Sequence, residues 1–493
     1  MKRAFLQKGF YWLCLAILLL LAAFLLFTRL GDYYICECDE ARHGINAYEM
    51  LQNGDYVVNT YNGEPDYWNL KPPLSYYCIM LGYRLFGFGT FGLRFYSAAS
   101  MLLCMSLLAL WMKKRHGSIA SLGSVLFFLG CHTVYGLHFA RFGDADAQMV
   151  LLYMLAMLCM LESQRNIRFL YGTALFFGLS FLSKSWHAAL IPVTCLLFLC
   201  VSGQLRKLRP RHYAGLVLCG LAPILPWALA RYSRDGLRFF EGMLSTDVYT
   251  RATTVLEGHE GDWAYYIRAL GSMPAVVLSC IAGLAALLCR GLNRRSLRPT
   301  TEQCGVALWI LTPLVLYSLC VSKLEWYVYV CLPAFALLFG KSLQALLRCP
   351  TRRSRLRWPG FVCALALTLP LCLWTWQNWL KVSAPAVVTR YQSIVQEYFD
   401  REINSGDHLY VEHTSIERDY FPEGADPASA WFQGDQLNAM FCGDLVCLPG
   451  GGEAFREDED HAYLLCNRND MDESLLEEYP IIYEDGPLVL LEN

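Results

Sequence analysis

Long apolar stretches separated by short polar segments make up most of the chain. The first stretch, residues 10–27, has close to the 20 residues that an α-helix needs to cross about 30 Å of hydrocarbon. It is too long for the apolar part of a signal peptide, and no small-residue cleavage site follows it. The pattern therefore predicts a polytopic, mostly α-helical membrane protein whose first transmembrane helix starts near Phe10.

Clusters of Lys and Arg between the apolar stretches predict the topology. Such clusters beside span ends mark the cytoplasmic side, so an even number of crossings must separate one cluster from the next. The clusters lie at residues 2–8, 113–115, 165–168, 206–211, 290–298 and 348–357. This parity predicts eleven crossings, a cytoplasmic N-terminus and an external C-terminus. The expected spans are 10–27, 93–112, 119–138, 145–161, 169–182, 188–201, 213–230, 267–289, 304–321, 327–347 and 361–376.

One apolar segment, residues 74–88, is excluded from this count. It is shorter than a span and contains Arg84. Counting it as a crossing would place residues 113–115 outside, against the charge rule. We therefore expect a helix that lies in the membrane interface.

The charge balance divides the chain into two parts. From Gln377 onward there are 24 acidic and 6 basic residues, against 19 and 35 in the rest. We expect a membrane domain over residues 1–378, with a first external loop at 31–92, and a soluble extracytoplasmic domain over 379–493. The bases sit in short clusters between apolar spans, so nucleic acid is not an expected partner.

The acidic tail contains strand-like runs that alternate with helix-like stretches, which predicts a small α/β domain. The expected strands are 408–412, 445–448, 462–466 and 487–491, and the first expected helix is 387–401. Cys442 and Cys447 lie in this tail and would pair only in an oxidising compartment, which leaves their state open. The acidic run 457–460 is most simply a solvated turn.

Polar residues that the topology places outside, at span ends, are candidates for chemistry. Asp39 and Glu40 follow the first span, and a carboxylate held there could act as a general base or bind a divalent cation. Lys71 precedes two prolines that start the interfacial helix, where a cation suits a phosphate ligand. The alternative for Lys71 is a snorkelling anchor, and for the acids a solvated position.

Further polar groups fall in later external turns. Arg141, Asp144 and Asp146 form a second acidic turn, for which an ordinary polar turn with a helix cap at Asp144 is the alternative. Lys184 and Lys323 occupy two tight turns, where each could equally be an interfacial anchor.

An ordered set of motifs resembles one family. It includes Asp39-Glu-Ala-Arg42, Gly54-Asp-Tyr, Lys71-Pro-Pro-Leu, Leu93-Arg94, Ala140-Arg141 with Asp146, Gly178–Lys184, Phe239–Tyr266 and Val321–Pro333. Together they cover nearly the whole membrane part. The pattern is similar to the GT-C family of bacterial 4-amino-4-deoxy-L-arabinose lipid A transferases, relatives of the protein O-mannosyltransferases.

The resemblance implies an inverting glycosyltransferase of the bacterial inner membrane that uses a polyprenyl-phosphate sugar donor. Asp39 would be the base or the acceptor-orienting carboxylate, with Glu40 and Asp146 shaping the site. The donor phosphate would be held by the basic residues Lys71, Arg42, Lys184 and Lys323. The acceptor would be a lipid, a glycan or a protein, because relatives differ in this respect.

One departure concerns a divalent metal ion. The family usually carries an acidic residue directly before the lysine of the KP motif, which is implicated in metal binding with a loop histidine that matches His259. This chain has Leu70 at that position, so a metal is in doubt. Asp144, His259 and Tyr327 are kept as candidates for a substrate or metal site.

A transporter or flippase of lipid-linked sugars is the alternative function. It would predict paired internal repeats and broken or charged helices near the bilayer midplane. No internal repeat is visible, and the polar residues gather at the external ends of the spans. We therefore favour the glycosyltransferase.

Overall fold

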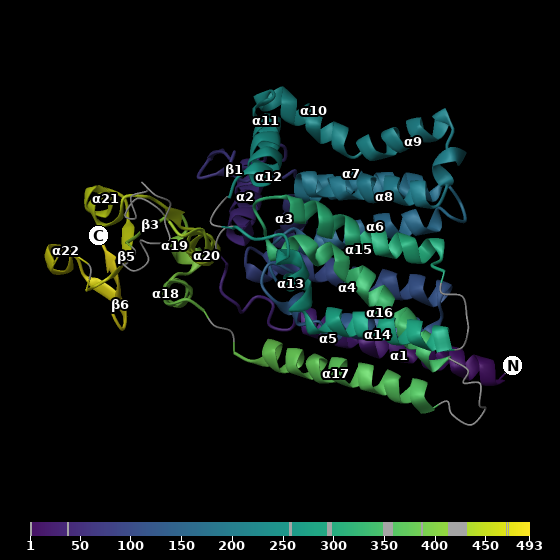
Figure 1. Ribbon diagram of the computed structural model, residues 1–493. Coiled ribbons are helices and arrows are strands. Elements are labelled where there is room, and N and C mark those ends of the chain that lie inside the picture. Colours follow the sequence, from purple (N-terminus) through teal and green to yellow (C-terminus); the bar gives the residue numbers. More distant parts are fainter. Residues whose placement is uncertain are drawn as a thin grey trace.

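The computed structural model describes residues 2–36, 39–255, 259–292, 298–348, 358–385, 388–412, 431–469, 471 and 473–493. The basic residues 294–295 and 352–357, on which two of the topology signals rest, lie outside the described residues. In the remainder, a bundle of long helices carries a small sheet domain at one end (Figure 1). The N-terminal helix starts at the other end of the bundle (Figure 1).

The helices of the membrane part follow the apolar stretches. They are α1 (Lys2–Phe27), α2 (Asp39–Asn53), α3 (Leu74–Phe86), α4 (Thr90–Arg115), α5 (Ser118–Gly130), α6 (Asp146–Glu162), α7 (Phe169–Lys184), α8 (Leu190–Val201), α9 (Pro210–Leu221), α10 (Ile224–Asp235), α11 (Arg238–Leu244), α12 (Arg251–Thr253), α13 (Tyr265–Gly271), α14 (Pro274–Leu292), α15 (Thr301–Leu319), α16 (Leu332–Leu347) and α17 (Trp358–Ser383). Two short antiparallel strands, β1 (Thr60–Tyr61) and β2 (Glu64–Pro65), lie in the first loop.

Seven helical segments of the described chain are long and apolar enough to cross a membrane. An eighth is reached if α9 and α10, which meet at a 53° bend, form one broken span. The chain is thus a multi-pass membrane protein, as the sequence predicts. The expected count of eleven crossings is not confirmed and stays a prediction, as does the side on which each terminus lies.

The longest of these segments, Phe169–Val201, folds back on itself. Gly172, near the start of α7, packs on Cys159, whereas Lys184 at its end reaches Asp146. These two contacts are at opposite ends of α6, so α7 runs antiparallel to it. Ser185, at a φ of 55°, then reverses the chain into the 3-10 helix η2 (Ser185–Ala189) and α8. Phe198 of α8 lies back at the far end, where Gly305 packs against it and against Leu161.

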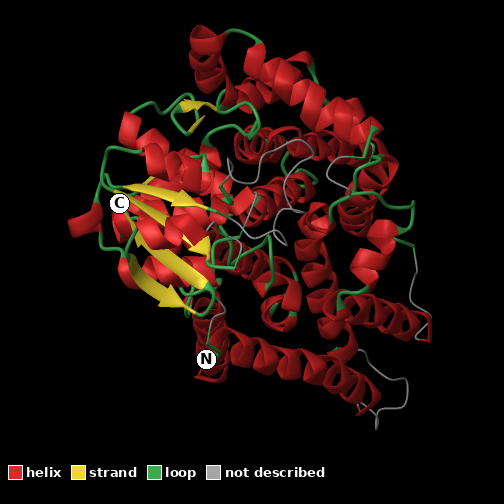
Figure 2. Cartoon of the chain, turned by 90° about the vertical axis from the view of Figure 1, so that its left-hand side faces the viewer, coloured by secondary structure: helices red, strands yellow, loops and turns green. Residues whose placement is uncertain are grey.

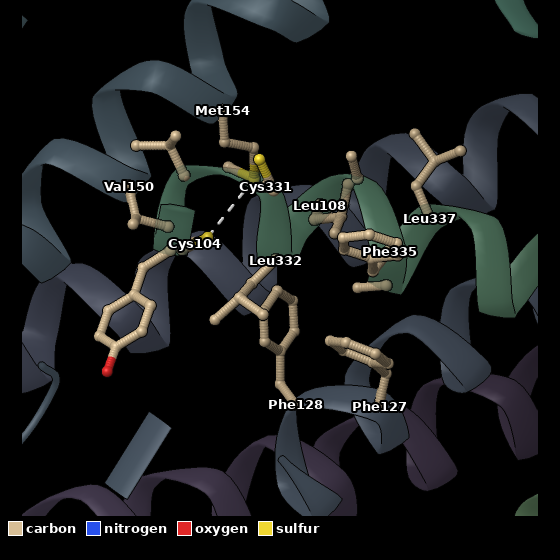
Figure 3. Packing of buried hydrophobic residues seen from close by; sticks show 14 of the residues in the cluster. Cys104, Leu108, Phe127, Phe128, Val150, Met154, Cys331, Leu332, Phe335 and Leu337 are labelled. Atoms are coloured by element: carbon tan, nitrogen blue, oxygen red, sulfur yellow. Dashed lines mark hydrogen bonds between the residues drawn. The ribbon is translucent and has the colours of Figure 1, made fainter. Parts of the chain in front are cut away.

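Buried apolar side chains from several helices fill the centre of the bundle. Cys104 of α4 and Met154 of α6 approach to 3.5 Å between their sulfur atoms. Phe128 of α5 and Leu332 of α16 close the same cluster (Figure 3). Because a close-packed core has low compressibility, this packing holds the helix ends, and the polar groups on them, in fixed positions.

The helix expected over residues 74–88 is present as α3, and its position in the membrane interface stays a prediction. With 13 residues it is about 20 Å long, too short to cross the hydrocarbon. Gly82 of α3 lies so close to the carbonyl of Gly92 at the start of α4 that a Cβ at position 82 would stand 2.1 Å from that oxygen. This close approach fixes the first loop against the bundle.

The tail has a five-stranded sheet with helices on both faces (Figure 2). The strand order is β4-β3-β5-β7-β6, with β3 parallel to β4 and β5, and β7 antiparallel to β5 and β6. The strands are β3 (His408–Val411), β4 (Val446–Cys447), β5 (Ala462–Asn467), β6 (Ile481–Asp485) and β7 (Leu488–Glu492). The helices are α18 (Arg390–Tyr398), α19 (Arg401–Asn404), α20 (Gln433–Gly443), α21 (Gly451–Glu457) and α22 (Glu473–Glu478).

The expected α/β tail is therefore confirmed, and alternate residues of β5 face opposite cores, as period-two alternation requires. Cys442 and Cys447 are both free thiols. The helix α17 continues to Ser383, past the expected domain division at residue 378, which itself stays a prediction.

The tail packs directly on the first loop. Leu437 and Phe441 of α20 complete the apolar cluster around α2 and α3. Tyr61 donates a hydrogen bond of 2.8 Å to Gln436, and Tyr48 donates one to Asp444. The loop and the tail thus share one core.

Candidate active site

The first candidates, Asp39 and Lys71, form an ion pair at the end of the bundle that carries the tail. Asp39 is the first residue of α2, and its Oδ1 lies 3.3 Å from the Nζ of Lys71. The same ammonium is 3.2 Å from Oδ1 of Asn69. Both charged side chains keep part of their surface exposed, 26% for Asp39 and 18% for Lys71. A ligand can therefore reach them.

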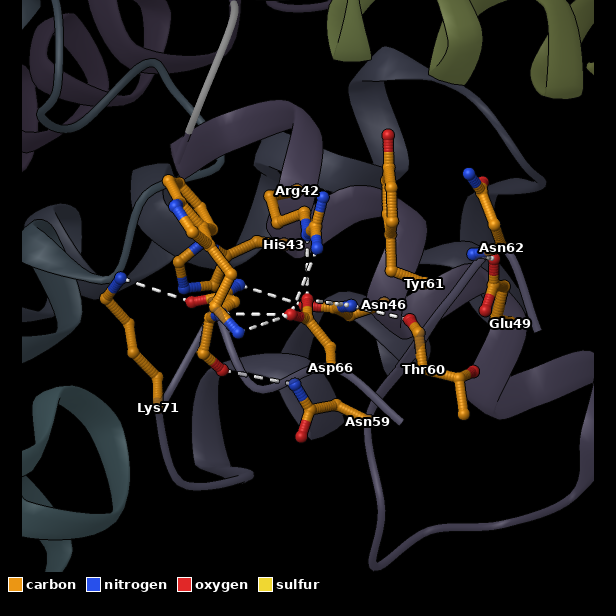
Figure 4. Close-up of polar contacts among 12 residues, drawn as sticks. Arg42, His43, Asn46, Glu49, Asn59, Thr60, Tyr61, Asn62, Asp66 and Lys71 are labelled. Atoms are coloured by element: carbon orange, nitrogen blue, oxygen red, sulfur yellow. Dashed lines mark hydrogen bonds and ion pairs between the residues drawn. The ribbon is translucent and has the colours of Figure 1, made fainter. Parts of the chain in front are cut away.

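Asp66 organises the loop that presents Lys71. Its carboxylate accepts hydrogen bonds from Arg42 Nε at 2.7 Å and Nη2 at 3.0 Å, from Asn46, and from the backbone of Asn69 (Figure 4). Arg42 also stacks over Tyr61, with its guanidinium carbon 3.3 Å from the ring centre. Arg42, expected to bind phosphate, is thus already committed to a bidentate ion pair that holds the loop.

Glu40 is fully buried and joins three segments. Arg94 of α4 binds it in a bidentate manner at 2.7 and 2.8 Å. The backbone N–H of Cys36 donates to the same carboxylate at 2.9 Å, and that of Gly143 at 2.6 Å. Glu40 therefore shapes the site from behind, by fixing the start of α2 to the second acidic turn.

The second acidic turn lies beside Asp39. Oδ2 of Asp144 is 3.1 Å from Nδ1 of His138, a residue with a φ of 55° that the fold holds in the left-handed region. The imidazole is stacked on Trp326, with ring centres 4.0 Å apart. Arg141 of this turn does not face the acids, because its guanidinium donates to carbonyls at the end of α1.

Asp146 and Lys184 form a second buried ion pair. Asp146 begins α6, Lys184 ends α7, and Nζ lies 2.5 Å from Oδ2. The ring of Tyr327 lies 5.9 Å from the same ammonium and packs on His187. The structure thus brings together four of the expected residues, Asp39, Lys71, Asp146 and Lys184, with Asp144 and Tyr327 beside them.

The cluster combines three carboxylates with cations. Burial alone would raise the pKa of Asp39, but the charges of Lys71, His43, Lys184 and His138 hold it well below its usual range. For His138, burial favours the neutral ring, yet the hydrogen bond and charge of Asp144 raise its pKa to about 9. With His138 protonated, three cations balance Asp39, Asp144 and Asp146.

Two candidates from the later loops take other places. Lys323 is buried, and its ammonium donates to the carbonyls of Ser318 and Cys320, which caps the end of α15. Its backbone N–H binds the carbonyl of His259 at 2.9 Å. These contacts of Lys323 thus stabilise a turn. They do not join it to the carboxylates, because its ammonium binds carbonyls at the end of the preceding helix.

Residue 70, where the family resemblance implies an acidic residue, does not support a metal site in this chain. Leu70 is buried in an apolar cluster with Trp227, Phe239 and Met243, and lies against Gly242. The buried members of this cluster offer no carboxylate, imidazole or thiol.

A different group of residues has suitable donor atoms for a divalent cation. Asp39, His138 and Asp144 each offer one donor, and these donors lie within 4.8 Å of one another. Oδ1 of Asp144 is buried and has no hydrogen-bond partner in the described part of the chain. Two carboxylates and an imidazole could hold such an ion.

The sequence analysis missed His138, Trp326 and Arg94. His138 closes a predicted span, and Trp326 adjoins the turn of Lys323, so both looked like ordinary interface residues. The available signal was a polar residue at a span end close to the Arg141–Asp146 turn. Arg94 was noted only as part of a motif, and its pairing with Glu40 spans 54 positions, which periodicity cannot show.

Comparisons with known proteins agree with this arrangement. Residues 70–229 match the family described as dolichyl-phosphate-mannose-protein mannosyltransferase. An undecaprenyl phosphate-α-4-amino-4-deoxy-L-arabinose arabinosyl transferase 2 of Pseudomonas fluorescens is 31% identical over 361 residues, 68% of this chain and 60% of the relative. An arabinosyl transferase of Pseudomonas aeruginosa is also 31% identical, over 67% of this chain and 60% of its own length. The chain therefore spans about 60% of the length of these curated relatives.

Solved structures share the fold over a greater length. ArnT from Cupriavidus metallidurans, crystallised with undecaprenyl phosphate, matches with a TM-score of 0.68 over 98% of both chains, at 16% identity. The archaeal oligosaccharyltransferase AglB from Archaeoglobus fulgidus matches with a TM-score of 0.53 over 94% of this chain and 70% of its own, at 11% identity. Given these matches and its helical bundle, the chain belongs to the ArnT-like GT-C family of membrane proteins.

Proposed function

We propose that this protein is an inverting membrane glycosyltransferase that moves a sugar from a polyprenyl-phosphate donor to a lipid, glycan or protein acceptor. The observation that carries the proposal is the pair of lysine–carboxylate contacts, Lys71 with Asp39 and Lys184 with Asp146, at one end of the bundle. The names of the curated relatives, which are arabinosyl transferases acting with undecaprenyl phosphate, support the same donor class.

The two lysines suit the departure of a phosphate. When the acceptor attacks the anomeric carbon, the bond from that carbon to the phosphate oxygen breaks, and the electron pair leaves with the polyprenyl phosphate. Negative charge then grows on the phosphate oxygens, and cations already held in place lower the barrier. Lys71 and Lys184 supply this charge, and protonated His138 adds to it.

Asp39 is assigned to the acceptor. In the resting cluster its low pKa makes it a weak base, because Lys71 lies beside it. A donor phosphate competes for Lys71, and a looser ion pair raises the basicity of Asp39. Donor binding thus prepares the carboxylate to orient the acceptor and take its proton. A divalent cation bound by Asp39, Asp144 and the neutral ring of His138 would take the place of the proton on His138 and supply the positive charge there instead.

The topology signals favour an external position for this site, on the periplasmic face of a bacterial inner membrane, with the N-terminus in the cytoplasm. There the sugar reaches an envelope acceptor such as lipid A. The tail, which packs on the first loop, then lies on the same external side.

The test is transfer of a labelled sugar from a polyprenyl-phosphate donor pool in membranes. We expect Asp39→Asn and Lys71→Ala to lower transfer by roughly 100-fold or more at matched expression. Arg84→Ala is the matched control, because Arg84 is an exposed cation on α3 that bonds only Tyr56 among the described contacts. Full activity in both site variants would refute the assignment.

A further inference from the structure

A crevice between three helices lies at the end of the bundle far from Asp39. Its apolar part has a volume of about 510 Å³ and is lined by α14, α15 and α16, with Leu284, Leu287 and Ile310 among the side chains. An adjoining hollow of about 320 Å³ shares Arg290 and Lys341 with it and adds His116 and Arg348. Among the described residues that line either space there is no carboxylate.

The position of this crevice follows from the helices that build it. α4 starts close to the site, where Arg94 binds Glu40, and ends at Arg115, next to His116. The 21 residues from Arg94 to Arg115 span about 30 Å, which is the thickness of the hydrocarbon core. The basic hollow is therefore one membrane thickness away from the candidate active site.

The dimensions of the crevice fit a lipid of one leaflet. On α14 the lining runs from Arg290 to Cys280, ten residues or about 15 Å, which is half of the hydrocarbon core. Its apolar wall is open to the surroundings, since Leu284 and Leu287 remain 59% and 46% exposed. An acyl chain can therefore enter from the side.

The preference of Lys and Arg for the cytoplasmic ends of spans does not by itself account for the basic residues that line the crevice. Lys341 lies six residues before the end of α16, about 9 Å inside the helix, where it pairs with Glu302 of α15. A charged residue within a helix of a membrane bundle is a functional candidate by default. His116 is 3.2 Å from the same glutamate. Glu302 thus contacts both Lys341 and His116, and the basic side chains of Arg290 and Arg348 line the same hollow.

We propose that this crevice binds one anionic phospholipid. Its phosphate would lie among Arg290, Lys341 and Arg348, and one acyl chain would lie between α14, α15 and α16. Basic pockets between membrane helices recognise such head groups, and arginine binds phosphate oxygens with well-oriented donors. The inference is independent of the proposed activity, because it concerns the opposite end of the molecule.

The test is lipid binding by the purified full-length protein, measured by native mass spectrometry. Phosphatidylglycerol and phosphatidylcholine with the same acyl chains are compared. We expect one tight site for phosphatidylglycerol, with at least tenfold preference. In the variant Arg290→Gln with Arg348→Gln, which leaves the Lys341–Glu302 pair intact, affinity should fall about 25-fold, or about fivefold for each cation.

Two further variants test the location. Arg206→Gln with Lys207→Gln removes two exposed cations of the short helix at residues 204–207, which line neither space, and should leave binding unchanged. Ala307→Trp fills the apolar part and should abolish tight binding. Equal binding of both lipids, or equal loss in both double variants, would overturn the proposal.

The same experiment identifies the occupant. Free glycerol phosphate should not compete, because it lacks the acyl chain. Competition by glycerol phosphate would show a soluble-anion site, and tighter binding of a polyprenyl phosphate would show a site for the donor or product lipid. Either result would refute the phospholipid assignment.

Discussion

Replacing Glu40 by Gln should destabilise the protein by about 3–5 kcal/mol, although the two side chains have the same shape. Four donors converge on the Glu40 carboxylate, two on each oxygen. Arg94 Nε and the N–H of Gly143 bind Oε1, and Arg94 Nη2 and the N–H of Cys36 bind Oε2. A glutamine must turn its NH₂ group toward one of these two pairs of donors. In either orientation, two N–H groups then face the NH₂ group, which is itself a donor, and they lose their acceptor.

The magnitude follows from these bonds. Each hydrogen bond to a charged acceptor contributes about 1.5–3 kcal/mol, and two are lost. The buried Arg94 also loses its counter-charge, and breaking a buried ion pair from one side costs about 3–5 kcal/mol. The two arguments agree, because Glu40 and Arg94 are both inaccessible to water.

The measurement is equilibrium unfolding in mixed micelles with increasing SDS, followed by tryptophan fluorescence. Glu49→Gln is the control on the same helix, since Glu49 accepts from two backbone N–H groups near solvent and its replacement should cost about 1 kcal/mol or less. Glu40→Met combined with Arg94→Met should recover only part of the loss, because no charge stays buried alone but the N–H groups of Cys36 and Gly143 lose their acceptor. A Gln variant as stable as the Glu49 control would refute the reasoning.

Three further outcomes are expected. Leu70→Glu should lower the unfolding free energy by several kcal/mol, because the new carboxylate enters an apolar cluster. It should bind no more metal than the wild type in an elemental assay of the purified protein, and a higher metal content would contradict this. Lys184→Met should lower the unfolding free energy by about 3–5 kcal/mol in the SDS titration, because Asp146 is left buried without its partner. Lys184→Met combined with Asp146→Asn should lower it much less, while sugar transfer stays low in both variants. Recovered transfer in the double variant would show that Lys184 does not belong to the phosphate site. Gly44→Val should weaken the packing of the tail by about 1–3 kcal/mol, since a Cβ at position 44 would stand 2.3 Å from a methyl group of the buried Leu437. The tail should then be cleaved faster in limited proteolysis, and an unchanged cleavage rate would show that the contact can relax.

The helical bundle, the tail sheet and most of the cluster could be predicted from the sequence, because each leaves a local signal. Apolar stretches of about 20 residues predict helices, short apolar runs predict the strands, and the KP motif marks Lys71. Helix ends were less certain: α17 continues to Ser383, beyond the expected division at residue 378, because its apolar pattern fades gradually.

What the sequence could not show is how single polar residues are used. Arg42, Lys71 and Lys323 are all cations in external loops, yet only Lys71 lies on a candidate catalytic carboxylate. Arg42 is held by Asp66, 24 positions away, and Lys323 is held by the end of its own neighbouring helix. Such differences depend on which acceptors the fold brings close to each cation, and the local sequence pattern contains no information about that distance.

The packing of the tail on the first loop has a consequence for biosynthesis. Tyr48 and Asp444, which bond across that interface, are 396 positions apart in the chain. At about 5–20 residues per second, the ribosome reaches Asp444 roughly 20–80 s after Tyr48. The helix that starts at Asp39 must wait through this interval with part of its apolar face uncovered. The apolar side chains of the first loop that Leu437 and Phe441 cover in the finished protein therefore stay open until the tail has been synthesised.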